Sequence, residues 1–415
     1  MQVTADGPLG QSSANMPAAC WVVAAGVGAA LHIGKLPPAL PVLERVLGVT
    51  LLQAGFLLSL VQFAGMFLGL LTGLAVQRVG LKRSMIAGLL VLACASALGA
   101  LAESATGLLV TRAFEGLGFL WVVLPGPALL RMYVPRQRIN RMMGIWGTYM
   151  PLGTSLALLL GPWVLLMGTH DGGWRLWWAI LSAVALAFSL ALFLRLPSDR
   201  SPGNASPVST ADHASKGLLR RTLASGPVWL LALSFGMYSG QWLAVVGFLP
   251  SIYAKAGVAT TTAAWLTALA AGLNMVGNVA AGRLLERGTG AVTLLVTGFV
   301  VMGSGAVLAF GIEVGPWWKY TAVLAFSMVG GLIPATLFSL AIRLAPGAST
   351  VATTVGWMQQ WSSAGQFLVP PLMAWVAMYA GGWQWTGWVS ATFCVLGLLL
   401  AAQIRRELSR HPPDV

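Results

Sequence analysis

Long apolar runs recur along this chain and constrain its fold more than any other feature. A helix needs about 20 apolar residues to cross the hydrocarbon core of a bilayer. Only 8% of the residues are charged, against roughly 25% in soluble domains, so lipid must solvate most of the surface. The runs cover approximately residues 17–45, 51–76, 84–102, 107–130, 142–168, 175–196, 223–254, 261–282, 291–312, 318–342, 351–379 and 384–404. The sequence therefore predicts an all-α integral membrane protein with twelve transmembrane helices.

The net charge of +13 could suit nucleic acid, but the distribution of that charge argues against such a partner. If the N-terminus is cytosolic, eighteen Lys and Arg residues fall in cytosolic segments and four in outer segments. Cytosolic loops of membrane proteins carry such an excess. We therefore expect an N-in, C-in protein of the inner (plasma) membrane, with lipid around it and no nucleic-acid partner.

A polar stretch that begins at Pro197 divides the chain into two halves. It is rich in Ser, Pro and Asp, which is typical of a flexible linker. The predicted organisation is a cytosolic tail (1–16), a six-helix bundle (17–196), a cytosolic linker (197–222), a second six-helix bundle (223–404) and a C-terminal tail (405–415).

The two halves form an internal repeat. One ungapped shift of 209 residues superposes Leu40-Pro41 on Leu249-Pro250, Gly73 on Gly282, Arg78 on Arg287, and Pro125 on Pro334. With an even number of helices in each half, both halves insert with the same orientation, so an axis along the membrane normal relates them. We expect the two equivalent prolines to kink their helices.

The loop between spans two and three carries a family resemblance. It reads GLAVQRVGLKR from Gly73 to Arg83 and is similar to the signature of the major facilitator superfamily. The resemblance implies two pseudo-symmetric bundles, alternating access and gating loops, with no cofactor. The family usually has Asp at the position of Gln77, so the salt bridge made by that Asp is not expected here. The gating residues it implies are Gly73, Gln77, Arg78, Gly80, Lys82 and Arg83, and in the second copy Gly282, Glu286 and Arg287.

Three further segments resemble one branch of that superfamily, the cyanate and nitroimidazole permeases. They read LPGPALLRMYVP (124–135), GQWLAVVGFLPSIY (240–253) and GWMQQWSSAGQ (356–366). This resemblance implies a small anionic or planar polar solute.

Four ionisable residues in the first half mark a candidate working site. A charge in hydrocarbon is costly unless it faces a cavity or a partner. His32 and Lys35 are spaced i,i+3, as are Arg112 and Glu115, so each pair shares a helix face. At ~1.5 Å per residue, Lys35 and Arg112 lie ~8–9 Å below the outer end, and the other two ~12–13 Å below it. This pattern predicts an anion-attracting cup that opens outward.

Less specific interpretations of these residues remain open. Lys35 could extend to the outer interface, Arg112 and Glu115 could be a structural or gating pair, and His32 could be a core residue. As a functional group, Glu115 is the candidate proton carrier, because burial favours the neutral acid whereas the neighbouring Arg112 favours the carboxylate. His32 is the alternative carrier, because an imidazole titrates near neutral pH.

The second half has no charge within its spans, so we expect its side of the cavity to be neutral. The 209-residue shift places Gln241 at the position of His32. The helical faces predicted to contact the substrate carry Tyr238, Gln241 and Trp242, then Asn274, and then Trp357 with Gln360. These amides and rings could bind cargo, or they could hydrogen-bond between helices as structural groups.

Together these features predict a secondary transporter that imports a small anionic or planar polar organic solute with protons, as a functional monomer. An enzyme is not expected, since one acid and one histidine in the spans cannot supply a metal cluster or a carboxylate pair. No metal site is predicted. The alternatives are a proton-coupled exporter of amphipathic compounds, or a receptor built on the same fold.

Overall fold

The computed structural model describes residues 15–69, 79–135, 138–168, 173–198, 217–347 and 350–410, and within these ranges every regular element is helical. The predicted gating residues Gly73, Gln77 and Arg78 and most of the linker lie outside the described residues. The helices are α1 (Met16–Gly34), α2 (Leu36–Leu47), α3 (Leu51–Ser59), η1 (Leu60–Gln62), α5 (Leu81–Ala100), α6 (Ala105–Val123), α7 (Gly126–Tyr133), α8 (Ile139–Gly147), α9 (Tyr149–Leu165), α10 (Trp174–Arg195), α12 (Gly226–Lys255), α13 (Thr260–Glu286), α14 (Ala291–Ala306), η3 (Val307–Gly311), α15 (Pro316–Gly330), α16 (Leu332–Leu344), α17 (Val351–Tyr379) and α18 (Gln384–Arg410).

Eleven helical segments of the described chain are long and apolar enough to cross a membrane. They include the broken segments Met16–Leu47, Ala105–Tyr133 and Pro316–Leu344. The helix α17 is also 29 residues long but is more polar, since it carries Gln359, Gln360 and Gln366. The predicted all-α membrane fold is thus confirmed, and the twelfth span stays a prediction.

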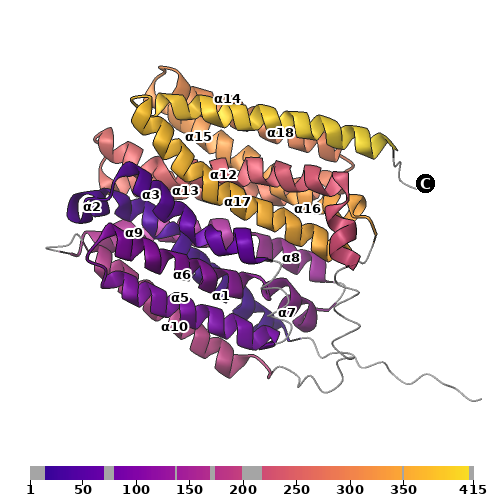
Figure 1. Ribbon diagram of the computed structural model, residues 1–415, viewed down its shortest axis with the longest axis horizontal. Coiled ribbons are helices and arrows are strands. Elements are labelled where there is room, and N and C mark those ends of the chain that lie inside the picture. The colour runs from indigo at the N-terminus through magenta and orange to yellow at the C-terminus, as the bar shows by residue number, and fades with distance from the viewer. Residues whose placement is uncertain are drawn as a thin grey trace, which may run out of the picture.

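The helices gather into two groups that follow the order of the chain (Figure 1). The first group packs α5 against α6 and α10, and α1 against α9 and α10. The second packs α12 against α17 and α18, and α14 against α18. The main contacts between the groups join α3 to α17, α9 to α13 and α2 to α12.

The two groups approach closely at one end of the molecule. We call the end where α1 begins and α18 finishes the termini side, and the opposite end the far side (Figure 1). Towards the far side, a Cβ on Gly55 would lie 2.8 Å from Pro371, and one on Gly247 would lie 2.9 Å from the Leu58 side chain. On the termini side, α7, α8 and α16 have no extensive contact with the other group among the described elements. The bundles are therefore closed on the far side.

Several long segments break where proline removes a backbone donor. The segment with Pro125 divides into α6 and α7, and the segment with Pro334 divides into α15 and α16. Both breaks confirm the predicted kinks. A third break, between α1 and α2, falls at Lys35 and is followed directly by Pro37 and Pro38.

Candidate functional site

Lys35 lies at the junction of α1 and α2. Two prolines begin the second helix, and neither can donate a backbone hydrogen bond to the turn before it. At this break the Lys35 carbonyl accepts from Trp177 Nε1 of α10 at 3.2 Å. The helix break therefore lies within the bundle, and it brings the Lys35 ammonium into the bundle interior, where its exposure is 0%.

Glu115 on α6 is the anionic partner at this point. One carboxylate oxygen pairs with Lys35 Nζ, and the other lies 2.6 Å from Arg112 Nη1, one helical turn away. A single buried carboxylate is thus shared by two cations from different helices. The structure brings together what the sequence presented as two separate i,i+3 pairs.

The Lys35 ammonium has further partners that sequence reasoning missed. It donates to Ser96 Oγ at 2.9 Å and lies 4.5 Å from the centre of the Trp178 ring. Ser96 in turn donates to the Trp178 carbonyl. These contacts rule out the alternative in which Lys35 extends to the membrane interface.

Arg112 connects the cluster to the backbone of two neighbouring helices. Its Nη1 donates to the His32 carbonyl at 2.6 Å, and its Nε donates to the Leu57 carbonyl at 3.0 Å. Its Nη2 is buried and has no hydrogen-bond partner among the described residues. The His32 ring lies beside Leu181 of α10, with Nδ1 3.5 Å from Lys35 Nζ.

The four side chains, which we call the charge cluster, are sealed inside the first bundle. His32, Lys35, Arg112 and Glu115 are at most 2% exposed. Their contacts come from α1, α3, α5, α6 and α10, all in the first half. In this conformation the predicted cup is closed.

A neutral network occupies the matching part of the second bundle. Asn274 Nδ2 donates to the Tyr238 hydroxyl and to the Ser327 carbonyl, each at 2.9 Å. Trp242 Nε1 donates to Ser327 Oγ at 3.0 Å, and Asn278 Nδ2 donates to Asn274 Oδ1 at 3.0 Å. The predicted residues do come together, and their hydrogen bonds join α12, α13 and α15.

Gln241 occupies a place equivalent to His32. Both are fully buried on the first long helix of their half and face its last helix. Gln241 Nε2 donates to the Met237 carbonyl at 2.8 Å, and its Oε1 lies 3.4 Å from Cys394 Sγ of α18. The pseudo-symmetry thus places a neutral amide where the first half has an imidazole.

Trp357 and Gln360 are one turn apart on α17 but have different neighbours. Trp357 packs against Trp229 at 5.0 Å between ring centres, on the stripe that continues to Leu368 and Trp375, which are 56% and 49% exposed. Trp357 itself is half-buried, and its ring packs against its own half of the chain. Gln360 Nε2 instead donates to the Met66 carbonyl of the first half at 2.8 Å.

Another polar contact between the bundles was missed by sequence reasoning. Gln62 Nε2 donates to Gln366 Oε1 at 3.0 Å, and Gln366 donates to Ser362 Oγ at 3.2 Å. Gln62 ends the 3₁₀ turn that follows α3. The carbonyl of Leu57, which accepts from Arg112, therefore lies within two turns of Gln62, which contacts the other bundle. Glutamines within apolar spans were the available signal.

Among the gating residues of the first predicted loop, Lys82 contacts its own bundle. Lys82 donates to the Phe193 and Leu196 carbonyls of α10 at 2.9 and 2.6 Å. Gly80 has φ of +100° just before α5, which favours glycine. In the second loop, Gly282, Glu286 and Arg287 are exposed. Arg83 is also exposed.

The described ranges contain no group of three or more His, Cys, Asp or Glu side chains that could hold a metal ion. We therefore assign no metal centre in this part of the chain.

Comparison with solved structures identifies the fold. A bacterial homologue of the human lysosomal transporter Spinster, in an inward-facing and occupied conformation, superposes with a TM-score of 0.80. The match covers 96% of this chain and 99% of that one at 14% identity, so it shows the fold alone. The chain therefore shares the fold of that protein.

The sequence comparisons then give the family. The chain belongs to the Major Facilitator Superfamily, whose family model matches residues 21–368. It is similar to the cyanate transport protein CynX of Escherichia coli (strain K12), with 24% identity over 88% of this chain and 90% of the relative. It is also similar to the 2-nitroimidazole transporter of the same organism, with 26% identity over 84% of each chain. The predicted superfamily is confirmed, and both of these relatives belong to the transporters that the predicted branch named.

Proposed function

We propose that this protein is a secondary active transporter that imports a small anionic or planar polar organic solute together with protons. The relatives support this class of cargo, because cyanate is a small anion and 2-nitroimidazole is a planar polar ring. We further propose twelve spans with α17 as one of them, a functional monomer, and cytosolic termini in the inner membrane. The structure would then be closed towards the outside.

The observation that carries the proposal is the charge balance of the cluster. Lys35 and Arg112 supply two cations and Glu115 supplies one carboxylate, so the three groups sum to +1 when all are ionised. Buried cations are stable only when they are paired and hydrogen-bonded. The unused Nη2 of Arg112 and the excess positive charge together favour an anionic ligand.

Proton coupling follows from competition for the same two cations. An anionic cargo that pairs with Lys35 and Arg112 displaces the Glu115 carboxylate from one or both of them. A displaced carboxylate in an apolar interior binds a proton more readily. A monovalent anion and one proton would then enter together without net charge. His32 is the alternative proton carrier, because its ring lies against Lys35.

Access to the cluster requires a change of conformation, since the four side chains are sealed in this state. Arg112 also holds the Leu57 carbonyl of α3, and α3 packs against α17 of the other bundle. We expect release of Arg112 to change this contact between the bundles. The Gln62–Gln366 hydrogen bond is then the first contact across the bundles to respond.

The test is uptake by proteoliposomes with labelled cyanate and 2-nitroimidazole as probes. Lys35→Ala and Arg112→Ala should each weaken anion binding, by about 2–5 kcal/mol if the pair is desolvated. Lys319→Ala is the matched control, because this lysine is partly exposed and pairs only with exposed Glu313. Normal anion binding by both cluster variants would contradict the anion proposal.

Glu115→Gln separates binding from coupling. We expect this variant to retain exchange of cargo and to lose accumulation driven by a proton gradient. Undiminished accumulation would move the coupling role to His32 or indicate a uniporter. Transport only outward under the same gradient would indicate an exporter, and binding without any flux would indicate a receptor.

A further inference from the structure

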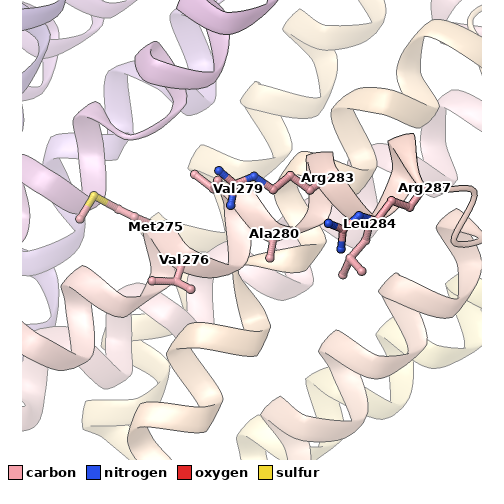
Figure 2. Close-up of a pocket in the computed structure, with 7 residues that line it drawn as sticks. All are labelled: Met275, Val276, Val279, Ala280, Arg283, Leu284 and Arg287. Atoms are coloured by element: carbon pink, nitrogen blue, oxygen red, sulfur yellow. The ribbon is translucent and has the colours of Figure 1, made fainter.

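A hollow of about 490 Å³ runs along the termini-side half of α13. Figure 2 shows its lining, which comes from this helix and from Arg287 at its C-cap. The lining residues are Met275, Val276, Val279, Ala280, Arg283, Leu284 and Arg287. Apolar side chains occupy the part nearer the middle of the helix, and two arginines occupy the part nearer its end.

The hollow exists because the bundles separate along α13. Nearer the far side, α9 covers this helix, and Ser155 Oγ donates to the Ala268 carbonyl at 2.8 Å. A Cβ on Gly272 would still lie 3.2 Å from Ser155 Oγ. From Met275 onward no α9 residue lines the hollow. The uncovered surface therefore includes the continuation of the face that α9 covers.

The same surface also faces the membrane. Trp265 and Leu269 are 59% and 50% exposed, and one helical stripe leads from them to Val276 and Val279, which are 50% and 44% exposed. In a membrane-spanning helix, large apolar side chains with this exposure contact acyl chains. The hollow is thus open to lipid from the side.

The two arginines at the end of the hollow lack partners in the protein. Arg283 and Arg287 are spaced i,i+4, and within the described ranges neither side chain makes a hydrogen bond or an ion pair. Glu286 is exposed and lies about 100° around the helix from Arg287 and one turn from Arg283, and it forms no ion pair with either arginine in the described structure. Figure 2 shows both side chains extending along the helix, with the Arg283 guanidinium close to Val279.

The dimensions of the hollow match one leaflet of a bilayer. From Met275 to Arg287 the helix rises roughly 18 Å at ~1.5 Å per residue. Half of the hydrocarbon core is about 15 Å thick, so the arginines reach the level of the headgroups while the apolar residues lie beside the acyl chains.

We propose that this hollow binds an anionic phospholipid. Its phosphate pairs with Arg283 and Arg287, and its acyl chain lies against Met275, Val276 and Val279. The site lies partly on the same face of α13 that α9 covers nearer the far side. A bound lipid therefore prevents α9 from closing onto the termini-side half of α13. The lipid thereby stabilises the conformation described here. This inference does not depend on the identity of the cargo.

The binding test uses purified full-length protein and native mass spectrometry with phosphatidylglycerol, compared with phosphatidylcholine. Arg283→Ala/Arg287→Ala should bind phosphatidylglycerol about 30-fold more weakly, from about 1 kcal/mol per basic residue and 1.4 kcal/mol per tenfold change. Arg405→Ala/Arg406→Ala is the matched control, since it removes two exposed charges from the same side outside the hollow. The control and Arg283→Lys/Arg287→Lys should retain binding. Equal losses in both alanine pairs would overturn the site.

The conformational test measures the distance between the bundles in nanodiscs. Spin labels at Gly147→Cys and Gly347→Cys suit this purpose, because a Cβ at either glycine meets nothing within 4 Å and both lie on the termini side. The three native cysteines are replaced. Phosphatidylglycerol should shift the population towards the longer distance in the wild-type background and not in the Arg283→Ala/Arg287→Ala background. A distribution that is the same in both lipids would overturn the link to closure.

Discussion

Glu115→Gln should destabilise this protein more than Lys35→Met, although the two residues are partners in one ion pair. The reason is the charge that each change leaves in the bundle. The native groups sum to +1, from two cations and one carboxylate. Glu115→Gln leaves +2 with no counter-charge, whereas Lys35→Met leaves the Arg112–Glu115 pair and a sum of zero.

The magnitudes follow from burial. Removing one partner of a buried ion pair costs about 3–5 kcal/mol. Glu115 pairs with two cations that are at most 2% exposed. We therefore expect the stability lost in Glu115→Gln to lie at the upper end of that range. Lys35→Met loses the contacts with Ser96 and the Trp178 ring but removes a buried charge, so about 1–3 kcal/mol is expected. In the double variant the sum is again +1, so its cost should fall below the sum of the single costs by on the order of 3 kcal/mol.

Reversible unfolding in mixed detergent micelles measures these free energies, with helicity as the signal. The matched control is the Lys319–Glu313 pair at 3.4 Å, whose side chains are 33% and 96% exposed. Its equivalent single and double variants should each change stability by at most about 1 kcal/mol. The reasoning is refuted if Glu115→Gln costs no more than Lys35→Met, or if the two cluster changes are additive.

Two further predictions concern helix contacts. Gly116→Ala should lower the free energy of unfolding by about 1–3 kcal/mol, because its Cβ would lie 2.6 Å from the Val61 carbonyl oxygen. Gly282→Ala is the control and should change stability little, because its Cβ would meet nothing within 4 Å. Equal unfolding free energies of the two variants would contradict this reasoning. Gln62→Leu should lower stability by about 1–3 kcal/mol, because it leaves the buried amide across the bundle interface without its donor. The exposed Gln359→Leu serves as the control for that measurement, and a loss of the same size there would show that the cross-bundle hydrogen bond is not the cause.

The amino-acid sequence by itself determined the class of fold. The length and spacing of the apolar runs predict membrane-spanning helices, because unpaired backbone groups cannot be exposed to hydrocarbon. Proline positions located the helix breaks near Pro125 and Pro334, since proline removes a donor wherever the chain folds. Helical periodicity also identified which charges share a face, as with Arg112 and Glu115. Each of these properties depends on a single segment.

Only the tertiary structure decided how those segments meet. The pairing of Lys35 with Glu115, and the roles of Ser96 and Trp178, depend on the rotation and tilt of three helices relative to one another. Periodicity placed Trp357 one turn from Gln360 on α17, yet its ring packs against Trp229 of its own half whereas Gln360 contacts the first half. The Gln62 amide found its partner about 300 residues further along the chain. The residues that share a helical face can be identified from one segment alone. Which helix packs against that face depends on the packing of all the helices together, so no single segment specifies it.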